Sequence, residues 1–386
     1  MVSRVERGRL ADWWYTVDKH LLVASLSLIF IGIVLSLAAS PPVAERIGIA
    51  DPYHFVKNQG VYCVPAIAIL FGMSFLDPKT IRRVSMLIFV VCIVLLVAVL
   101  FIGPEVKGAR RWLSIAGVSV QPSEFIKPAF AVISGFLFAE GMRHREVPGR
   151  LLSAGMLVLV AGLFILQPDF GQTILVSVTW ASLLFLAGMS WFWILGLLGI
   201  GVLGGFAAYE MADHVRSRIE RFLNPDSGDN YQVEQALNAI VGGGWLGRGP
   251  GEGIVKRILP DSHTDYIFAV AAEEYGIILC IGLVAIYAFI VMRGLGHAVR
   301  ENDSYIRLAS SALVVLVGVQ SCINIAVSLH LMPSKGMTLP FISYGGSSLI
   351  SAAMTMGMLL ALTRKRPDQT RFVAPFDGRS ILTPAE

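Results

Sequence analysis

Long apolar runs separated by short polar loops recur along almost the whole chain. A hydrocarbon core about 30 Å thick needs roughly 20 apolar residues per helix, and stretches of about that length occur about ten times. The predicted membrane spans are residues 21–40, 59–76, 85–103, 125–140, 151–167, 171–188, 191–211, 266–292, 308–330 and 341–362. The pattern therefore predicts an all-α, polytopic membrane protein with about ten transmembrane helices.

The polar segments divide the chain into one membrane domain with two tails. We expect an N-terminal tail at 1–19, a membrane domain at 20–363 and a C-terminal tail at 364–386. The loop at 212–264 is the only long excursion, and it contains a helix-like piece at 231–241 followed by a glycine-rich stretch. None of these polar segments is long enough to form a separate soluble domain.

Composition supports the membrane assignment and excludes a soluble enzyme. The 386 residues are 55% hydrophobic and 15% charged, with a mean hydropathy of +0.68. The net charge of +4 does not indicate a nucleic-acid partner, because the basic residues are spread over short loops between the apolar runs. The four cysteines lie inside apolar runs and lack the short spacing of a metal or redox motif.

The positions of the basic residues predict the orientation. With the N-terminus inside, the inner segments carry 18 Lys and Arg residues, whereas the short outer loops carry six. Long loops contribute little to this rule, so the basic residues of 212–264 do not change the balance. The asymmetry predicts that both termini are cytoplasmic and that 212–264 is an extracytoplasmic loop.

Two outer loops carry cations where the topology rule predicts few. Lys107, Arg110 and Arg111 precede Trp112 in one of them, and Lys335 lies in another. Arginine presents a planar fork to oxyanions, so these residues are candidate ligands for a phosphate-bearing substrate. The alternative is an anchor for lipid headgroups, with Trp112 in the interfacial aromatic belt.

Charged residues within or beside the predicted spans are a second signal, because each one at membrane depth costs roughly 2.5–3.5 kcal/mol on insertion scales. Glu124 and Lys127 are spaced i, i+3 where the fourth span begins, so they share one helix face. Pro128 cannot donate a hydrogen bond to the carbonyl of Glu124. A structural ion pair and a catalytic role are equally compatible with this pattern. Asp169 lies in a tight outer turn, where turn chemistry and a functional acid are the alternatives.

The segment that enters the eighth span holds a dense group of titratable residues. His263 and Asp265 lie at its outer mouth, and Glu273 and Glu274 lie about two turns deeper, roughly 12 Å along the helix. We expect a direct chemical role for Asp265. For the two glutamates, pairing within the bundle is the alternative to such a role.

The glycine-rich stretch before this segment matches a known motif. Gly242, Gly244 and Gly247 have the G-x-G-x-x-G spacing of dinucleotide-binding loops. No strand is predicted before them, and the loop is predicted to face outside, where dinucleotides are absent, so we reject that interpretation. A flexible flap that carries Arg248 and Lys256 is the remaining functional interpretation.

An outer site with cations and a carboxylate suits an anionic, lipid-borne substrate that enters from the bilayer. Because nucleotides are absent outside, group transfer there needs a donor that carries its own leaving group, as a polyprenyl-diphosphate sugar does. A carboxylate would act as general base on an acceptor hydroxyl, while Lys or Arg holds the departing diphosphate. No ligand set requires a metal, although Mg²⁺ on the diphosphate is conceivable.

Five motifs strengthen this interpretation: K-G-A-R-R-W-L, Q-P-S-E-F-I-K, Q-P-D-F-G-Q, L-P-D-S-H-T-D-Y-I-F-A-V-A-A-E-E-Y-G and K-G-M-T-L-P-F-I-S-Y-G-G-S-S. They resemble the SEDS family (shape, elongation, division and sporulation) over about residues 18–366. The form K-G-M-T-L-P is similar to the division branch of that family and less similar to its elongation branch. The resemblance implies a peptidoglycan glycosyltransferase of the bacterial inner membrane. It would polymerise lipid II at the division septum, with inversion at the anomeric carbon and undecaprenyl diphosphate as the leaving group.

The resemblance also implies roles for individual residues. It places the essential acid at Asp265, a paired acid and base at Glu124 and Lys127, and a functional acid at Asp169. The chain departs from the family pattern at Asp261, where the family usually has glutamate, so we assign no role to that side chain.

Supporting residues and partners complete the expectation. His263, Ser343 and the outer cations would help to bind the substrate. The implied partners are lipid II, a class B penicillin-binding protein and other membrane proteins of the division machinery.

Two other classes of function remain open at this point. A lipid II flippase needs polar groups through both leaflets, whereas Asp265 and the cations are predicted to cluster outside; Glu273 and Glu274 are the features that favour a flippase. A non-catalytic scaffold of the division machinery would explain partner binding but not the polar clusters.

Overall fold

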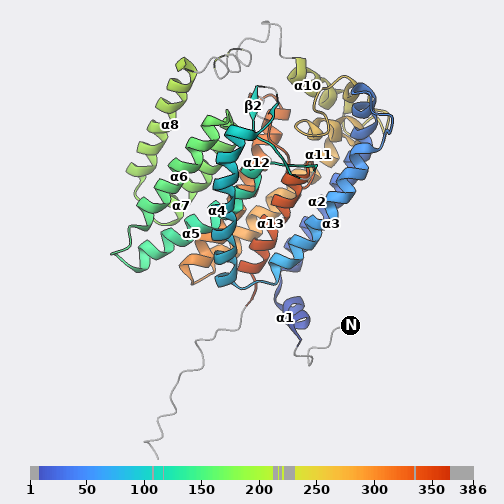
Figure 1. The fold of residues 1–386 in the computed structure, drawn as a ribbon. Coiled ribbons are helices and arrows are strands. Elements are labelled where there is room, and N and C mark those ends of the chain that lie inside the picture. Colours follow the sequence, from blue (N-terminus) through green and yellow to red (C-terminus); the bar gives the residue numbers. More distant parts are fainter. Residues whose placement is uncertain are drawn as a thin grey trace, which may run out of the picture.

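The computed structural model describes residues 8–106, 108–115, 117–211, 216, 220, 231–333 and 336–365. Most of them lie in long helices that run side by side as a bundle (Figure 1). A helix lies at each predicted span: α2 (Lys19–Arg46), α3 (His54–Ser74), α4 (Pro78–Ile102), α5 (Pro122–Arg143), α6 (Gly149–Leu166), α7 (Phe170–Leu186), α8 (Trp191–Met211), α11 (Ile267–Val299), α12 (Ser304–Ser328) and α13 (Gly346–Leu362). A short helix, α1 (Arg9–Thr16), precedes them.

The length and composition of these helices fit a membrane. Among the described residues, seven helices are long and apolar enough to cross one, namely α2 to α6, α11 and α12. Helices α7 and α13 are apolar but shorter. The chain is therefore a polytopic helical membrane protein, as its hydrophobic pattern predicts.

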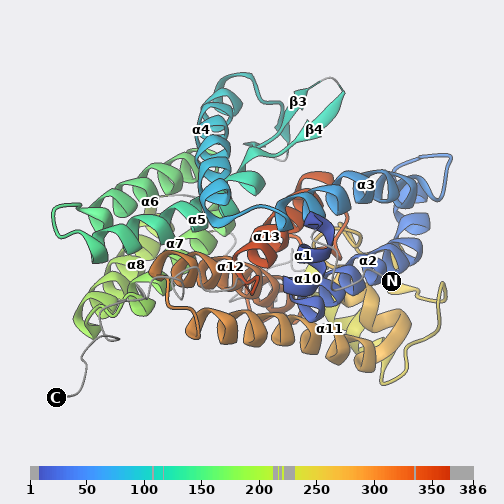
Figure 2. The same ribbon diagram turned by 90° about the horizontal axis from the view of Figure 1, so that it is seen from below.

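Three helices form the centre of the bundle. Nearly every described residue of α13 is buried, and Figure 2 shows α13 enclosed by its neighbours. Helices α5 and α12 pack against each other so closely that a Cβ on Gly135 would lie 2.7 Å from the backbone nitrogen of Ala309. Small residues of this kind let helix backbones approach each other in a membrane.

Two short β-hairpins connect α4 to α5, where the sequence predicted only a loop. Strand β1 (Glu105–Val106) pairs with β2 (Ala109–Arg110), and β3 (Leu113–Ile115) pairs with β4 (Val118–Val120), both antiparallel. They lie at the end of the bundle opposite α1 (Figure 1). The all-α expectation is wrong at these strands, because two or three residues are too few to show an alternating pattern.

The glycine-rich stretch forms part of a second structure at the end of the bundle that carries the hairpins (Figure 1). Helix α10 (Tyr231–Gly243) leads into the turn at 244–249, and a 3₁₀ helix, η2 (Val255–Arg257), follows. A Cβ on Gly247 would overlap the backbone of Glu274, so this turn is packed against α11 and is not the free flap that the sequence suggested.

Helix α11 is interrupted, although the sequence predicted a continuous span at 266–292. Gly276 has φ 79° and ψ 179°, which lie outside the helical region, and the helix continues beyond it to Val299. A single glycine inside an apolar run is tolerated in a regular helix, so the break has no signal in the sequence.

The last helix begins later than predicted. The expected span at 341–362 starts with a loop, and α13 begins only at Gly346. Phe341 and Gly345 have φ values of 67° and 159°, which a helix does not allow.

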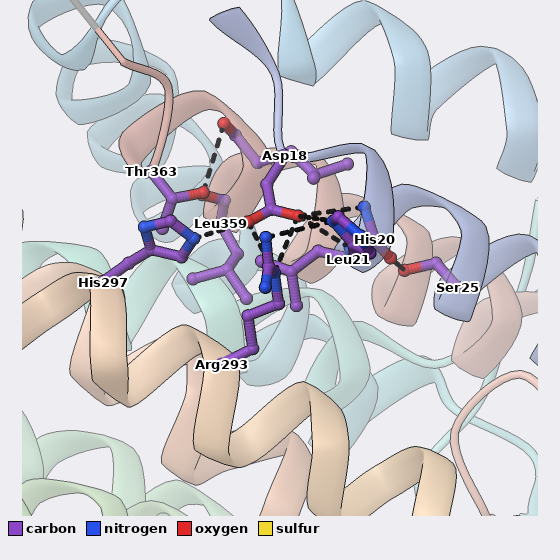
Figure 3. A network of polar contacts seen from close by, with 9 residues as sticks. Asp18, His20, Leu21, Ser25, Arg293, His297, Leu359 and Thr363 are labelled. Carbon is purple, nitrogen blue, oxygen red and sulfur yellow. Dashed lines mark hydrogen bonds and ion pairs between the residues drawn. The ribbon is translucent and has the colours of Figure 1, made fainter.

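A polar cluster joins the start of α2, just after α1, to α11 (Figure 3). Asp18 caps the N-terminus of α2 by accepting hydrogen bonds from the N–H groups of His20 and Leu21 at 3.0 and 3.1 Å. Its carboxylate also accepts from Nε of Arg293 at 2.7 Å and contacts Nε2 of His297. Burial raises the pKa of Asp18, but hydrogen bonds from Arg293 and His297 outweigh burial and leave the pKa below its ordinary value.

Candidate active site

A buried ion pair lies on the first turns of α5. Lys127 Nζ donates to Glu124 Oε2 at 2.8 Å and to Gln320 Oε1 of α12 at 3.1 Å. Only 2% of the Lys127 side chain and 5% of the Glu124 side chain are exposed. Pro128 frees the backbone carbonyl of Glu124, and the hydroxyl of Ser351 on α13 donates to it at 2.6 Å. Three central helices therefore meet at this pair.

The predicted acid Asp169 belongs to the same polar system. It caps α7, and the side chain of Gln172 in the first turn of α7 donates to Glu124 Oε1 at 2.6 Å. Arg111 reaches into the turn from the loop after β2: its Nε lies 3.9 Å from Asp169 Oδ2 and donates to the carbonyl of Gln167 at 3.2 Å. The structure thus connects Arg111, Asp169 and Glu124, although Asp169 is far from the other two in the sequence.

Helix α12 links the ion pair to Asp265. Gln320 contacts Lys127, and Asn324, one turn further out on the same face, donates to the backbone carbonyl of Asp265 at 3.0 Å. A separation of four residues corresponds to about 6 Å along a helix. The same face of α12 therefore contacts the Glu124–Lys127 pair at Gln320 and the backbone of Asp265 at Asn324. We call the set Arg111, Asp169, Gln172, Glu124, Lys127, Gln320, Asn324 and Asp265 the polar belt.

The loop that carries Asp265 is fixed by its own backbone. The N–H groups of Thr264, Asp265 and Tyr266 all donate to the carbonyl of Asp261, at 3.1, 3.0 and 3.3 Å. Asp261 has φ 51°, a left-handed conformation that aspartate tolerates better than most residues. The departure from the family pattern at Asp261 therefore falls on a residue that shapes the turn.

A second loop, 336–345, packs against the first. Ser343 donates from its hydroxyl to the carbonyl of Thr264 at 2.6 Å and accepts from the N–H of Leu339 at 2.8 Å. His263 packs its ring against Phe55 and Tyr344, with centroid distances of 4.6 and 5.4 Å. Both predicted residues hold the two loops together around Asp265.

A narrow cavity lies beside the ion pair. Its polar lining comes from Glu124, Lys127, Gln320, Ser348, Ser351 and Thr355. It joins α5, α12 and α13 within the bundle, so the two charges of the pair line a space between helices.

The predicted cations have different positions. Arg111 is part of the polar belt, whereas Arg110 is exposed in β2, where its nearest acid, Glu105, lies 3.9 Å away. Lys107 and Lys335 lie outside the described residues.

Sequence reasoning missed the amides that connect the charges. Gln172, Gln320 and Asn324 are buried, and each donates a hydrogen bond to a predicted site residue or its backbone, or receives one from it. The spacing of Gln320 and Asn324, i and i+4 within an apolar span, is a signal that would have placed both on one helix face.

The fold and the polar belt together define a class: a polytopic membrane protein with a titratable site between helices at one end of the bundle. The family model described as "Cell cycle protein", which covers FtsW, RodA and SpoVE, matches residues 19–368. The chain belongs to this family.

Named relatives agree with this assignment. The probable peptidoglycan glycosyltransferase FtsW of Caulobacter vibrioides is 45% identical over 95% of this chain and 94% of its own length. The probable peptidoglycan glycosyltransferase FtsW of Halomonas elongata is 34% identical over 98% of this chain and all of its own length.

Solved structures share the fold. A chain from a peptidoglycan synthase complex that coordinates polymerization and crosslinking matches with a TM-score of 0.75 and 27% identity, covering 91% of this chain and 98% of that one. The rod shape determining protein RodA of Thermus thermophilus matches with a TM-score of 0.67 and 26% identity, covering 91% and 97%.

Proposed function

We propose that the chain is a peptidoglycan glycosyltransferase that polymerises lipid II, and that Asp265 is its catalytic base. The observation that carries this proposal is one face of α12, on which Gln320 accepts a hydrogen bond from Lys127 and Asn324 donates one to the backbone carbonyl of Asp265. The family and the names of the relatives supply the substrate class.

The reaction transfers a sugar from a diphosphate-linked donor to a hydroxyl of the acceptor. The carboxylate of Asp265 takes the hydroxyl proton while that oxygen attacks the anomeric carbon of the donor. A new glycosidic C–O bond forms, the C–O bond to the diphosphate breaks, and undecaprenyl diphosphate departs with the electron pair. Attack opposite the leaving group inverts the anomeric centre.

The exposed cations and the buried ion pair would have different roles in this reaction. Arg110 is exposed on its hairpin and, with Lys107 and Lys335, is proposed to bind the diphosphate. The buried Glu124–Lys127 pair, which Gln320 joins to α12, is proposed to keep the helices next to the site in place. We invoke no resident metal, and a Mg²⁺ ion would enter with the diphosphate.

We further propose that the protein lies in the inner membrane at the division septum with both termini cytoplasmic. The charge asymmetry of the loops supports this orientation. An impermeant thiol reagent should therefore label a single cysteine at position 145 only when the inner face is open, and labelling in intact cells would contradict the orientation.

Two rival functions have less support. The flippase alternative depended on Glu273 and Glu274, but Glu273 bonds to the backbone of η2 and Glu274 pairs with Lys256, all within the outer structure next to α11. A scaffold would need no buried charges beside a cavity, because a buried pair is costly to desolvate.

Polymerisation of purified lipid II tests the proposal. The full chain, reconstituted with a class B penicillin-binding protein, should produce glycan strands and release undecaprenyl diphosphate. The chain alone should be less active, because the described part of it holds no large outer domain to regulate its helices. Absence of polymer in both samples, together with movement of lipid II across the membrane, would favour the flippase instead.

A further inference from the structure

Two buried acids next to the break in α11 have no part in the mechanism above. Glu273 is 0% exposed and Glu274 is 1% exposed, and each lies about two turns from the outer end of α11. Such groups are expensive at this depth, so their contacts indicate what they do.

Glu273 binds the backbone of η2. Its Oε1 accepts from the N–H groups of Ile254 and Val255, both at 2.7 Å, and its Oε2 accepts from the N–H of Lys256 at 2.9 Å. Hydrogen bonds to an ionised carboxylate are stronger than neutral ones. One side chain of α11 therefore fixes three successive residues of the outer loop.

Glu274 holds the same segment through a side chain. Lys256 is 3% exposed, and its Nζ donates both to Glu274 Oε1 and to the carbonyl of Ala38 in α2, the latter at 3.0 Å. The segment after η2 is held to α2 again where Arg46 donates to the carbonyl of Leu259 at 2.8 Å. The outer loop is thus attached to two helices just before it reaches Asp265.

The break in α11 makes these contacts possible. The N–H groups of Arg248 and Gly249 donate to the carbonyls of Glu273 and Glu274 at 2.9 and 3.0 Å, where a continuous helix would use its own N–H groups. Beyond the break, the N–H of Ile277 donates to the carbonyl of Gly244 at 2.9 Å. The turn at 244–249 therefore replaces the helical hydrogen bonds that Gly276 removes.

We propose that Glu273, with the Lys256–Glu274 pair, is a positioning group for Asp265. This inference rests on the proposed function. The contacts fix the segment 253–266 on one side, while Asn324 and Ser343 fix the Asp265 loop on the other. Asp265 then faces its substrate from a loop held at both sides, and neither glutamate takes part in proton transfer.

Loss of this attachment should reduce turnover without removing Asp265. A displacement of about 1 Å at a reacting group can cost about 10²-fold in rate. Glu273→Gln keeps the size of the side chain but places an amide group against three N–H donors, so it weakens the attachment. We expect kcat for lipid II polymerisation to fall about 10²-fold, with little change in KM.

A distance measurement separates positioning from other roles. Spin labels at Ile258→Cys and Tyr53→Cys, two half-exposed outer positions, are introduced into the full chain after its native cysteines are replaced. Double electron–electron resonance should give a narrow distribution of distances between the two labels in the protein with Glu273. The distribution should be broad in the Glu273→Gln variant. Glu252→Gln, an exposed acid of the same loop, is the matched control and should leave both the distribution and kcat unchanged.

A second variant distinguishes a loss of positioning from a loss of folding. Lys256→Met with Glu274→Gln removes the pair as a whole, a change that buried pairs often tolerate without loss of stability. It should also broaden the distribution and lower kcat. A narrow distribution in the folded variants would overturn the proposal, and so would a broad distribution with unchanged kcat or a lowered kcat with a narrow one. If the wild type polymerises no lipid II, the proposed function fails, whereas the distance measurement still shows whether the attachment orders the loop.

Discussion

The two ends of the helix bundle both hold charged clusters, but the clusters differ in where their charges lie. At the end next to α1, which we propose to be the cytoplasmic or inner end, Arg293 and His297 have side chains that are 34% and 26% exposed, and both contact Asp18, which caps a helix. In the polar belt, Lys127 and Glu124 are 2% and 5% exposed and lie along a helix beside a cavity. One cluster joins helix ends where its two cations are partly exposed, and the other joins central helices inside the bundle.

The difference indicates different roles. Arg293 and His297 stay partly exposed, and the buried carboxylate of Asp18 that they contact also caps α2. A fully buried pair gives weak net stability, because desolvation offsets the attraction between the charges. We therefore interpret the inner cluster as structural and the polar belt as functional. The predictions that follow test this distinction.

The largest expected loss of stability comes from breaking the buried pair. Lys127→Met leaves Glu124 without its cation and should lower the free energy of unfolding by about 3–5 kcal/mol. Thermal unfolding in detergent measures this loss. Glu124→Gln combined with Lys127→Met removes both charges and should restore most of the stability, while lipid II polymerisation stays low.

The double variant decides between the two interpretations of this pair. Recovery of stability and of polymerisation together would make the pair structural, like the inner cluster. The side-chain amide that Glu124→Gln introduces can still accept the hydrogen bond from Gln172, so the comparison isolates the charge.

A smaller effect is expected at the inner end. Asp18→Asn keeps a side chain that caps α2 well but removes the negative charge that Arg293 and His297 contact. We expect a loss of about 1–3 kcal/mol in the free energy of unfolding, with the polymerisation rate per folded molecule unchanged. A rate that falls more than the folded fraction would show that the inner cluster also serves catalysis.

The lowered pKa of Asp18 predicts that stability depends on pH. Because the pKa of Asp18 is lower in the folded protein than its ordinary value, its contribution to stability is complete above the ordinary value and declines as the pH falls through the lowered one. Thermal unfolding of the wild type and of Asp18→Asn should therefore converge below about pH 4. A constant difference down to lower pH would contradict the assignment.

The sequence predicts the positions of the helices far better than the contacts between them. Apolar runs locate the long helices, because burial in lipid imposes a length and a composition on each membrane span. Asp265, Glu124, Lys127 and Asp169 also stand out, because charge is unusual in such runs. Their connection through Gln320 and Asn324 does not stand out, because amides are less unusual than charges in apolar runs. The helix that carries both amides, α12, is also distant in the sequence from α5.

The outer loop shows a second limit. The helix at 231–243 follows from its pattern, but the turn at 244–249 completes its hydrogen bonds on α11, about 30 residues later in the chain. Neither the break at Gly276 nor the burial of Lys256 can be predicted without that contact. The same residues therefore suggested a flexible flap.

The most direct test of the central claim compares two aspartates of one loop. Asp265→Asn keeps the shape of the side chain and removes the proposed base, so polymerisation of lipid II in the presence of the penicillin-binding partner should fall about 10²–10⁴-fold with normal folding. Asp261→Asn is the control, because asparagine tolerates the φ of 51° at that position and should preserve the rate. A folded, partner-bound Asp265→Asn that releases undecaprenyl diphosphate at nearly the wild-type rate would contradict the account.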